Sequence, residues 1–356
     1  MKKNRMKTWI TLLLAGSLLM GTVTAYGSSN GDESAMESFN LGTLATTGHI
    51  LAFVAKEEGF FEEEGLDVEI NRFSSAAEMS AALEGEKLDA AFFGCVPAIT
   101  FQSQGHDLTI FGGAMTNGHG YVIKKESMEE GKEGLELLVD KKVAVAKFSV
   151  MDAELKMLLK EAGIEYGDDE GQVHIEYFDT PGECYAALSN KEIDAACVFS
   201  PYISRSENEG YEKVYLCAEL ESCEDQPCCR AIAEASNFKE NPEMFVAFER
   251  ALIKAYKFYQ ENHEETIADA GNYIDLDADI LDMELYAGYG SSNPDPGKKA
   301  TLAFKDVLLD LGIIEDYDIE PLFNLDIYRE ALDSILAEYP DDEFYQAMDE
   351  HYEECN

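Results

Sequence analysis

The sequence has few basic residues. Against 71 Asp and Glu, the 356-residue chain carries only 27 Lys and Arg, which gives a formal net charge of -44. A surface this acidic repels phosphate backbones and anionic lipid headgroups. We therefore exclude nucleic acid as a partner and interpret acidic blocks such as Glu62–Glu64 as solvated faces. These blocks lack the spaced Asp/Asn-Gly pattern of a calcium loop.

Beyond Ala25 the chain also lacks any apolar stretch long enough to span a bilayer. The segment 1–25 reads as a secretory signal, with basic residues, an apolar run over 9–23 and small residues up to Ala25. An uncleaved anchor is the weaker interpretation, because Gly16 and Gly21 dilute the run. No cysteine follows it, so the usual lipoprotein anchoring point is missing. We predict a flexible linker over 26–38 and a monomeric protein that is exported, extracellular or periplasmic, and associated with the cell membrane.

Motifs of catalysis are missing as well. The sequence contains no HExxH and no GxSxG, and its eight cysteines do not form repeated CxxC pairs. Four cysteines, Cys217, Cys223, Cys228 and Cys229, lie close together in sequence, and this spacing indicates a zinc site only weakly. A local disulfide or plain thiols are the favoured interpretation. We expect no cofactor and no metal.

What the chain does contain is an alternation of apolar strand patterns with helical patterns. Strands are predicted at 39–45, 66–74 and 88–94, with helices at 49–59 and 76–86 between them. The order resumes over 141–200. Strands separated by helices predict a largely parallel sheet in an α/β fold. Residues 241–262 carry an apolar stripe at helical spacing, which is typical of core packing.

An internal repeat divides the chain. "ALEGEKLDAAFF" at 82–93 returns at 187–198 as "ALSNKEIDAACV", and "KEEG" at Lys56 is matched by "KEAG" at Lys160. Any two strand-helix-strand units share some likeness, but matches in the same order at nearly constant offset predict two similar α/β lobes. We assign 39–118 to lobe 1 and 119–220 to lobe 2. Residues 221–356 are predicted to return to lobe 1 and to end in helices.

The segment around "AKEEGFFEEEGLDVE" resembles the substrate-binding proteins of ABC importers for nitrate, sulfonates and taurine, a branch shared with thiamine-pyrimidine binding and synthase proteins. The resemblance covers most of 39–262. It implies a two-lobe periplasmic-binding-protein-like fold of type II, with lobes joined by a two-crossing hinge. It further implies a small-molecule ligand held in the cleft and handed to an ABC importer permease. The alternative is a thiamine-pyrimidine synthase-like or cysteine-dependent enzyme, but "PCCR" departs from the longer cysteine run of eukaryotic synthases, so an enzyme is not expected.

Loops at the carboxyl ends of the strands of both lobes are the predicted ligand site. Ser149 is predicted first of all to cap a helix. Lys147 is either the cation that meets an acidic group of the ligand or a surface lysine. His49 either donates a hydrogen bond to the ligand or is structural. Hydroxyl-rich loops favour an oxyanion such as a sulfonate or nitrate, and a pyrimidine stacked on Tyr202 or Phe73 is the other option. The candidate residues are Thr46, Thr47, His49, Ser74, Ser75, Gly94, Cys95, Val96, Lys147, Ser149, Pro201 and Tyr202.

Overall fold

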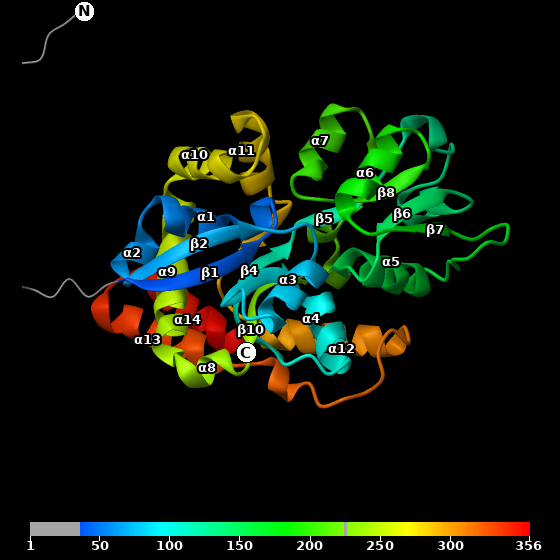
Figure 1. Cartoon of the computed structure of the whole chain (residues 1–356). Helices are drawn as coiled ribbons and strands as arrows, with labels where there is room; N and C mark the ends of the chain where they lie inside the picture. The colour runs from blue at the N-terminus through cyan, green and yellow to red at the C-terminus, as the bar shows by residue number, and fades with distance from the viewer. Residues whose placement is uncertain (1–35, 224–225) are drawn as a thin grey trace, which may run out of the picture. The chain divides into compact units, whose positions relative to one another are not determined.

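The protein is seen here as a computed structural model that describes residues 36–223 and 226–356 (Figure 1). The predicted signal over 1–25 and most of the predicted linker lie outside the described residues. The first strand already begins at Glu37. Within the described ranges, none of the helices combines the length and the apolar character that a membrane span requires.

Two separate β-sheets organise the chain, as the two-lobe α/β prediction requires. The first has six strands in the order β11-β4-β10-β3-β1-β2, and the second has five in the order β7-β6-β8-β5-β9. The strands of the first sheet are β1 (Glu37–Thr43), β2 (Leu66–Arg72), β3 (Ala90–Gly94), β4 (Leu108–Asn117), β10 (Pro227–Glu234) and β11 (Gly290–Ser292). Those of the second are β5 (His119–Ile123), β6 (Lys142–Ala146), β7 (His174–Phe178), β8 (Ala195–Phe199) and β9 (Glu212–Leu216).

The sequence repeat is a repeat of topology. In the first sheet β1 pairs in parallel with β2 and β3, and in the second β6 pairs in parallel with β7 and β8. The repeated "DAA" places Ala90 beside Leu41 in one sheet and Ala195 beside Val143 in the other. These alanines are fully buried, because helices cover both faces of a parallel sheet.

Helices cover both faces of the first sheet, and alternate residues of each strand point to opposite sides. Phe92 packs toward Phe248 on one face, whereas Phe93 meets Phe101 on the other. The stripe predicted over 241–262 is confirmed as core: Phe248 stacks on Phe39 at 4.7 Å between ring centroids. The helices here are α1 (Ile50–Glu57), α2 (Phe60–Glu63), α3 (Ala76–Glu84), α4 (Cys95–Ser103), α8 (Asn237–Glu240), α9 (Pro242–Glu261), α10 (His263–Tyr273), α11 (Ala278–Tyr286), α12 (Lys298–Asp310), α13 (Leu325–Glu338) and α14 (Glu343–Cys355).

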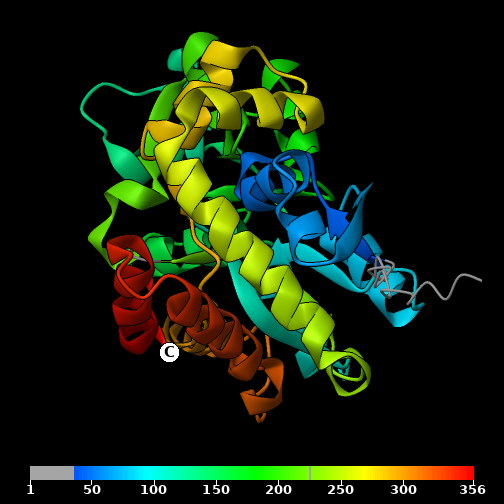
Figure 2. The same ribbon diagram turned by 90° about the vertical axis from the view of Figure 1, so that its left-hand side faces the viewer.

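The long helix α9 contributes many residues to the hydrophobic core of this half of the molecule. Figure 2 shows it running beside α13, and the two helices pack directly. On the second sheet the helices are α5 (Val150–Glu161), α6 (Pro181–Ser189) and α7 (Tyr202–Asn208), which share one apolar core with the strands.

The chain passes between the sheets at two places. It leaves the first sheet between β4 and β5 through Gly118, whose φ is +81° and at which a Cβ atom would lie 1.9 Å from Met115 Cε. Glycine adopts this left-handed conformation without strain, and any side chain there would have to displace the end of Met115. The chain returns between Leu216 and Pro227. The division into lobes at 118/119 and 220/221 stays a prediction, with the membership of the two sheets as its support.

Candidate functional site

Loops at the carboxyl ends of strands from the two lobes meet each other directly. Thr46, after β1, donates from Oγ1 to the Ser200 carbonyl oxygen at 2.7 Å, and Ser200 follows β8. The Thr47 and Ser200 hydroxyls are hydrogen-bonded as well. All three residues are at most 4 % exposed. The carboxyl ends of β1 and β8 therefore face one another, and the lobes are in contact at this point.

Local geometry prepares Thr46 for this contact. It is the N-cap of a short 3-10 helix, Thr47–His49, and its Oγ1 accepts from the Gly48 amide at 3.2 Å while donating to Ser200. A hydroxyl is one donor and two acceptors, so one side chain can cap a helix and bond across the cleft at once.

His49 has a structural role here, which is one of the two roles predicted for it. Its ring is fully buried beside Phe92, and Nδ1 accepts from the Leu44 amide at 3.0 Å. Burial lowers the pKa of His49 to about 3, with the Leu44 hydrogen bond opposing that shift. The ring is therefore neutral at physiological pH, and its second nitrogen is buried with no hydrogen-bond partner among the residues that the structure describes.

The other first-lobe candidates divide into caps and packing residues. Ser75 caps α3 by accepting from the Glu78 amide, and Ser74 is exposed. Gly94 is the N-cap of α4, and a side chain placed there would meet Val150 of the second lobe at 3.5 Å. Cys95 donates to the Pro227 carbonyl at 3.0 Å, and burial raises its pKa to about 12, so the thiol is uncharged. Val96 is buried beside it.

In the second lobe, Ser149 is confirmed as a helix cap. It accepts from the Asp152 amide at 3.2 Å and donates to the Ala146 carbonyl at 2.7 Å. Lys147 forms an exposed ion pair with Asp179 at 3.1 Å, which leaves its charge engaged within its own lobe. An exposed pair of this kind is weak, so a ligand of greater charge could displace it.

Pro201 is the N-cap of α7, and Tyr202 is its first residue. Tyr202 is half-buried and stacks on Tyr185 with centroids 4.9 Å apart, against Phe199 on its other side. Its ring is thus held by its own lobe. Among the described residues, its ring contacts are with Tyr185 and Phe199, both of lobe 2.

The structure adds lobe-bridging residues that the sequence reasoning missed. Glu284 in α11 accepts from the Ser204 amide at 2.7 Å and is bonded to its hydroxyl, although burial raises the pKa of this carboxyl. The Tyr289 hydroxyl donates to Glu207 at 2.9 Å. Ser200 lies at the end of the strand in the second copy of the repeat, and this position was the sequence signal that could have identified it. Glu284 and Tyr289 lie far along the chain from their partners and gave none.

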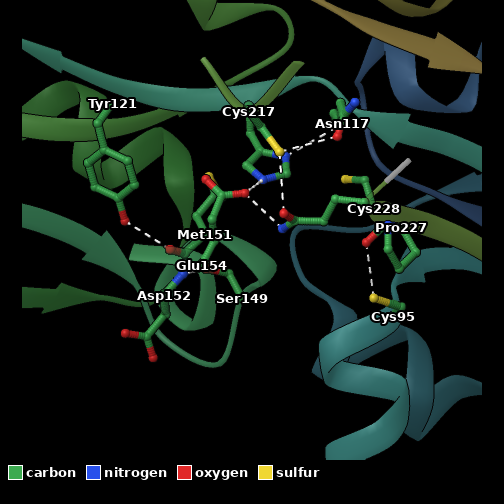
Figure 3. A network of polar contacts seen from close by, with 12 residues as sticks. Cys95, Asn117, Tyr121, Ser149, Met151, Asp152, Glu154, Cys217, Pro227 and Cys228 are labelled. Atoms are coloured by element: carbon green, nitrogen blue, oxygen red, sulfur yellow. Dashed lines mark hydrogen bonds and ion pairs between the residues drawn. The ribbon is translucent and has the colours of Figure 1, made fainter. Parts of the chain in front are cut away.

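A buried polar network lies where the chain crosses between the lobes (Figure 3). Glu154 Oε2 accepts from His119 Nε2 at 2.6 Å and from Gln226 Nε2 at 2.7 Å. Burial by itself would lower the pKa of His119, but Glu154 holds it well above its usual value, and His119 in turn keeps the pKa of Glu154 below its usual value against the effect of burial. Cys217 lies beside this ion pair, bonded to Asn117 Oδ1 at 3.2 Å.

Thiols surround the network. A hydrogen bond with Cys229 lowers the pKa of Cys228 to about 5, and contact with His119 adds to that shift against the effect of burial. Hydrogen bonding to Cys223 and burial raise the pKa of Cys217. Among the described residues, the donor atoms of His119, Glu154 and Cys217 lie within 4.8 Å of one another, a separation at which they could hold a metal ion.

Three cavities lie elsewhere on the described surface. Their volumes are about 380, 210 and 710 Å³, and they lie along β2, beside α14 and next to residues 132–139. None is lined by any of the twelve candidate residues, because the loops of the two lobes touch.

Comparison with known proteins agrees with this architecture. The chain is 25% identical over 286 residues to a Bacillus subtilis (strain 168) protein named an aliphatic sulfonates-binding protein, covering 79% of this chain and 82% of that one. It superposes on the periplasmic nitrate-binding protein NrtA of Synechocystis PCC 6803 with a TM-score of 0.72 at 18% identity, covering 84% and 89% of the two chains. For the periplasmic aliphatic sulphonate binding protein SsuA of Escherichia coli the TM-score is 0.67 at 19% identity, covering 80% and 91%.

These likenesses confirm the predicted periplasmic-binding-protein fold and the predicted family resemblance. The model of the NMT1-like family matches residues 32–274, which is more than half of the sequence. The chain belongs to the NMT1-like family.

Proposed function

We propose that this protein is the extracytoplasmic solute-binding component of an ABC importer. It captures a small molecule between its two lobes by hinge closure and delivers it to the membrane permease. The observation that carries the proposal is the contact of Thr46 and Thr47 with Ser200, since it brings loops at the carboxyl ends of strands of both sheets face to face across the lobes. Because those loops already touch, a solute enters only when the lobes separate.

Hinge closure follows from how the lobes are connected. Within the described residues, the two sheets are linked covalently by the passages at Gly118 and between Leu216 and Pro227. The other contacts between lobes are non-covalent, such as the hydrogen bond from the Ser204 amide to Glu284. A solute that bonds to both lobes favours the closed form through its differential affinity.

For the solute we propose a small oxyanion of the sulfonate or nitrate class. The loops supply hydroxyls and the amide groups of helix starts at Thr46, Ser75, Gly94 and Ser149, and such groups suit an anion. The chain's negative charge opposes anion approach over long range, but salt screens that repulsion beyond about 8 Å. A thiamine-pyrimidine precursor stacked on Tyr202 is the second candidate.

A thermal-shift screen tests this proposal. The mature chain is heated with an alkanesulfonate, taurine, nitrate, a thiamine-pyrimidine precursor and riboflavin, each at millimolar concentration. A rise in melting temperature with one of the first three, followed by a smaller radius of gyration in solution scattering, is expected. A compound that stabilises the protein while the radius of gyration and the affinity of a Thr47→Val variant stay unchanged would place its site outside the cleft.

Export, attachment to the cell membrane and the monomeric state belong to the same proposal. Fractionation of cells that express the full chain should place it outside the cytoplasm, with the segment 1–25 removed. Light scattering should give the mass of one chain.

A further inference from the structure

His119, Glu154 and Cys217 form a polar cluster that the proposed solute loops do not use. His119 is the first residue of β5 and so lies on the outgoing passage between lobes, and Cys217 lies on the returning one. Glu154 comes from α5 of the second lobe. All three residues are at most 1 % exposed, so the cluster lies in the interior of the protein.

The arrangement of the three donor atoms fits a cation. They lie within 4.8 Å of one another. A tetrahedral zinc ion, with bonds of about 2.0–2.3 Å to nitrogen, oxygen and sulfur, holds its ligand atoms roughly 3.3–3.8 Å apart. Movement of the side chains by about 1 Å would bring them to that spacing.

The hydrogen bonding around the cluster also fits a bound cation. The Glu154 carboxylate lies beside the Tyr215 hydroxyl, but among the described residues neither Glu154 Oε1 nor that hydroxyl makes a hydrogen bond of good geometry, and a buried polar atom without such a bond is costly. On its far side, the His119 ring has Nδ1 at 3.1 Å from the Asn117 carbonyl oxygen. Metal-ligating histidines commonly donate their second N–H to such a carbonyl, which fixes the ring.

We propose that His119 Nε2, a Glu154 carboxylate oxygen and Cys217 Sγ form a binding site for a borderline-soft divalent cation of the Zn²⁺ class. One nitrogen, one oxygen and one sulfur exclude Ca²⁺ and Mg²⁺, which take oxygen ligands. The cation replaces the proton between His119 and Glu154 and the proton of the Cys217 thiol. Gln226, which donates to Glu154 at 2.7 Å, is a positioning residue for the carboxylate.

The site has a consequence for the hinge. Its ligands come from both passages between the lobes and from a helix of lobe 2, so the bound cation ties these three segments together. It is a site distinct from the solute loops, and it stands or falls independently of the proposed solute.

Cobalt titration tests the site. The mature chain is stripped with a chelator and then receives Co²⁺ in two arms, one with folded protein and one during refolding from urea, because the cluster is buried. We expect one equivalent to bind in at least one arm, with the visible bands of a tetrahedral site and a near-ultraviolet thiolate-to-cobalt band, and to be displaced by Zn²⁺.

Variants locate the cation. Cys217→Ser should lose the thiolate band, Glu154→Gln should weaken binding at least tenfold, and Gln226→Ala should weaken it about 10- to 100-fold. Cys184→Ser, which removes another buried thiol of lobe 2, should change neither. Circular dichroism checks that each variant folds, and if Cys217→Ser or Glu154→Gln does not, the Gln226→Ala result decides. Failure to bind in both arms, or an unchanged spectrum in Cys217→Ser, overturns the proposal, and so does binding that is lost only when Cys228 and Cys229 are replaced by serine.

Discussion

The buried neutral histidine gives the sharpest pH prediction. His49 has a pKa of about 3 in the folded protein because burial disfavours its charged form, whereas an unfolded chain has a histidine pKa of about 6.5. The folded value is the lower one, so acid protonates the unfolded state first. The stability contributed by neutral His49 is therefore complete above about pH 6.5 and is lost progressively as pH falls toward 3. Between pH 7 and pH 5, this linkage removes about 2 kcal/mol of unfolding free energy.

Comparison with the variant His49→Asn separates the contribution of His49 to this loss from the contributions of the many acidic groups that also titrate. Asparagine keeps an acceptor near the position of Nδ1 for the Leu44 amide but does not titrate. Urea unfolding is followed at both pH values by circular dichroism, since the only tryptophan, Trp9, lies in the predicted signal. Between pH 7 and pH 5 the parent should lose more unfolding free energy than the variant, by about 2 kcal/mol, while His263→Gln, at an exposed position, should behave like the parent. Equal losses in parent and His49→Asn would refute a buried, neutral His49.

Three further perturbations follow from single contacts. Thr46→Val removes the hydrogen bond to the Ser200 carbonyl and should destabilise the closed form by about 0.5–1.5 kcal/mol, seen as a larger radius of gyration in scattering; an unchanged radius would mean that other contacts hold the lobes. Gly118→Ala forces a side chain into a left-handed position against Met115 and should cost at least about 1–2 kcal/mol, so a melting temperature equal to the parent's would contradict the tight passage. Burial raises the pKa of Glu249 well above its usual value, so Glu249→Gln should be more stable than the parent at pH 8, with the gain shrinking toward pH 5; a gain that does not change with pH would argue against a buried, titrating carboxyl.

Local sequence predicted the parallel half of each sheet well. The strands expected at 39–45, 66–74 and 88–94 correspond to β1, β2 and β3, and the repeat correctly indicated a second set with the same pairing. The helix expected over 49–59 corresponds to α1, which a 3-10 turn over 47–49 precedes, and α2 begins after Gly59 in the left-handed conformation. Positive φ at this glycine ends one helix and starts the next.

The antiparallel strands were not predicted individually. The antiparallel neighbour of β3 is β10, in which Ala231 pairs with Phe92, and the antiparallel neighbour of β8 is β5. Each arrives from the other side of a passage between lobes. Such partners depend on where the chain is carried in space and not on periodicity within a segment, so a local pattern cannot identify them.

The candidate site was predicted in its loops but not in its contacts. Capping by Ser149 follows from a side chain and an amide three residues apart, and the sequence by itself determined such local features, together with the two-lobe plan that the repeat encodes. Whether Thr46 meets Ser200, whether Lys147 is already paired, and which of the eight cysteines lie beside His119 were decided only by the tertiary structure. Local bonds depend on fixed covalent spacing, whereas these contacts join residues distant in the chain, which only the packing of both lobes brings within reach.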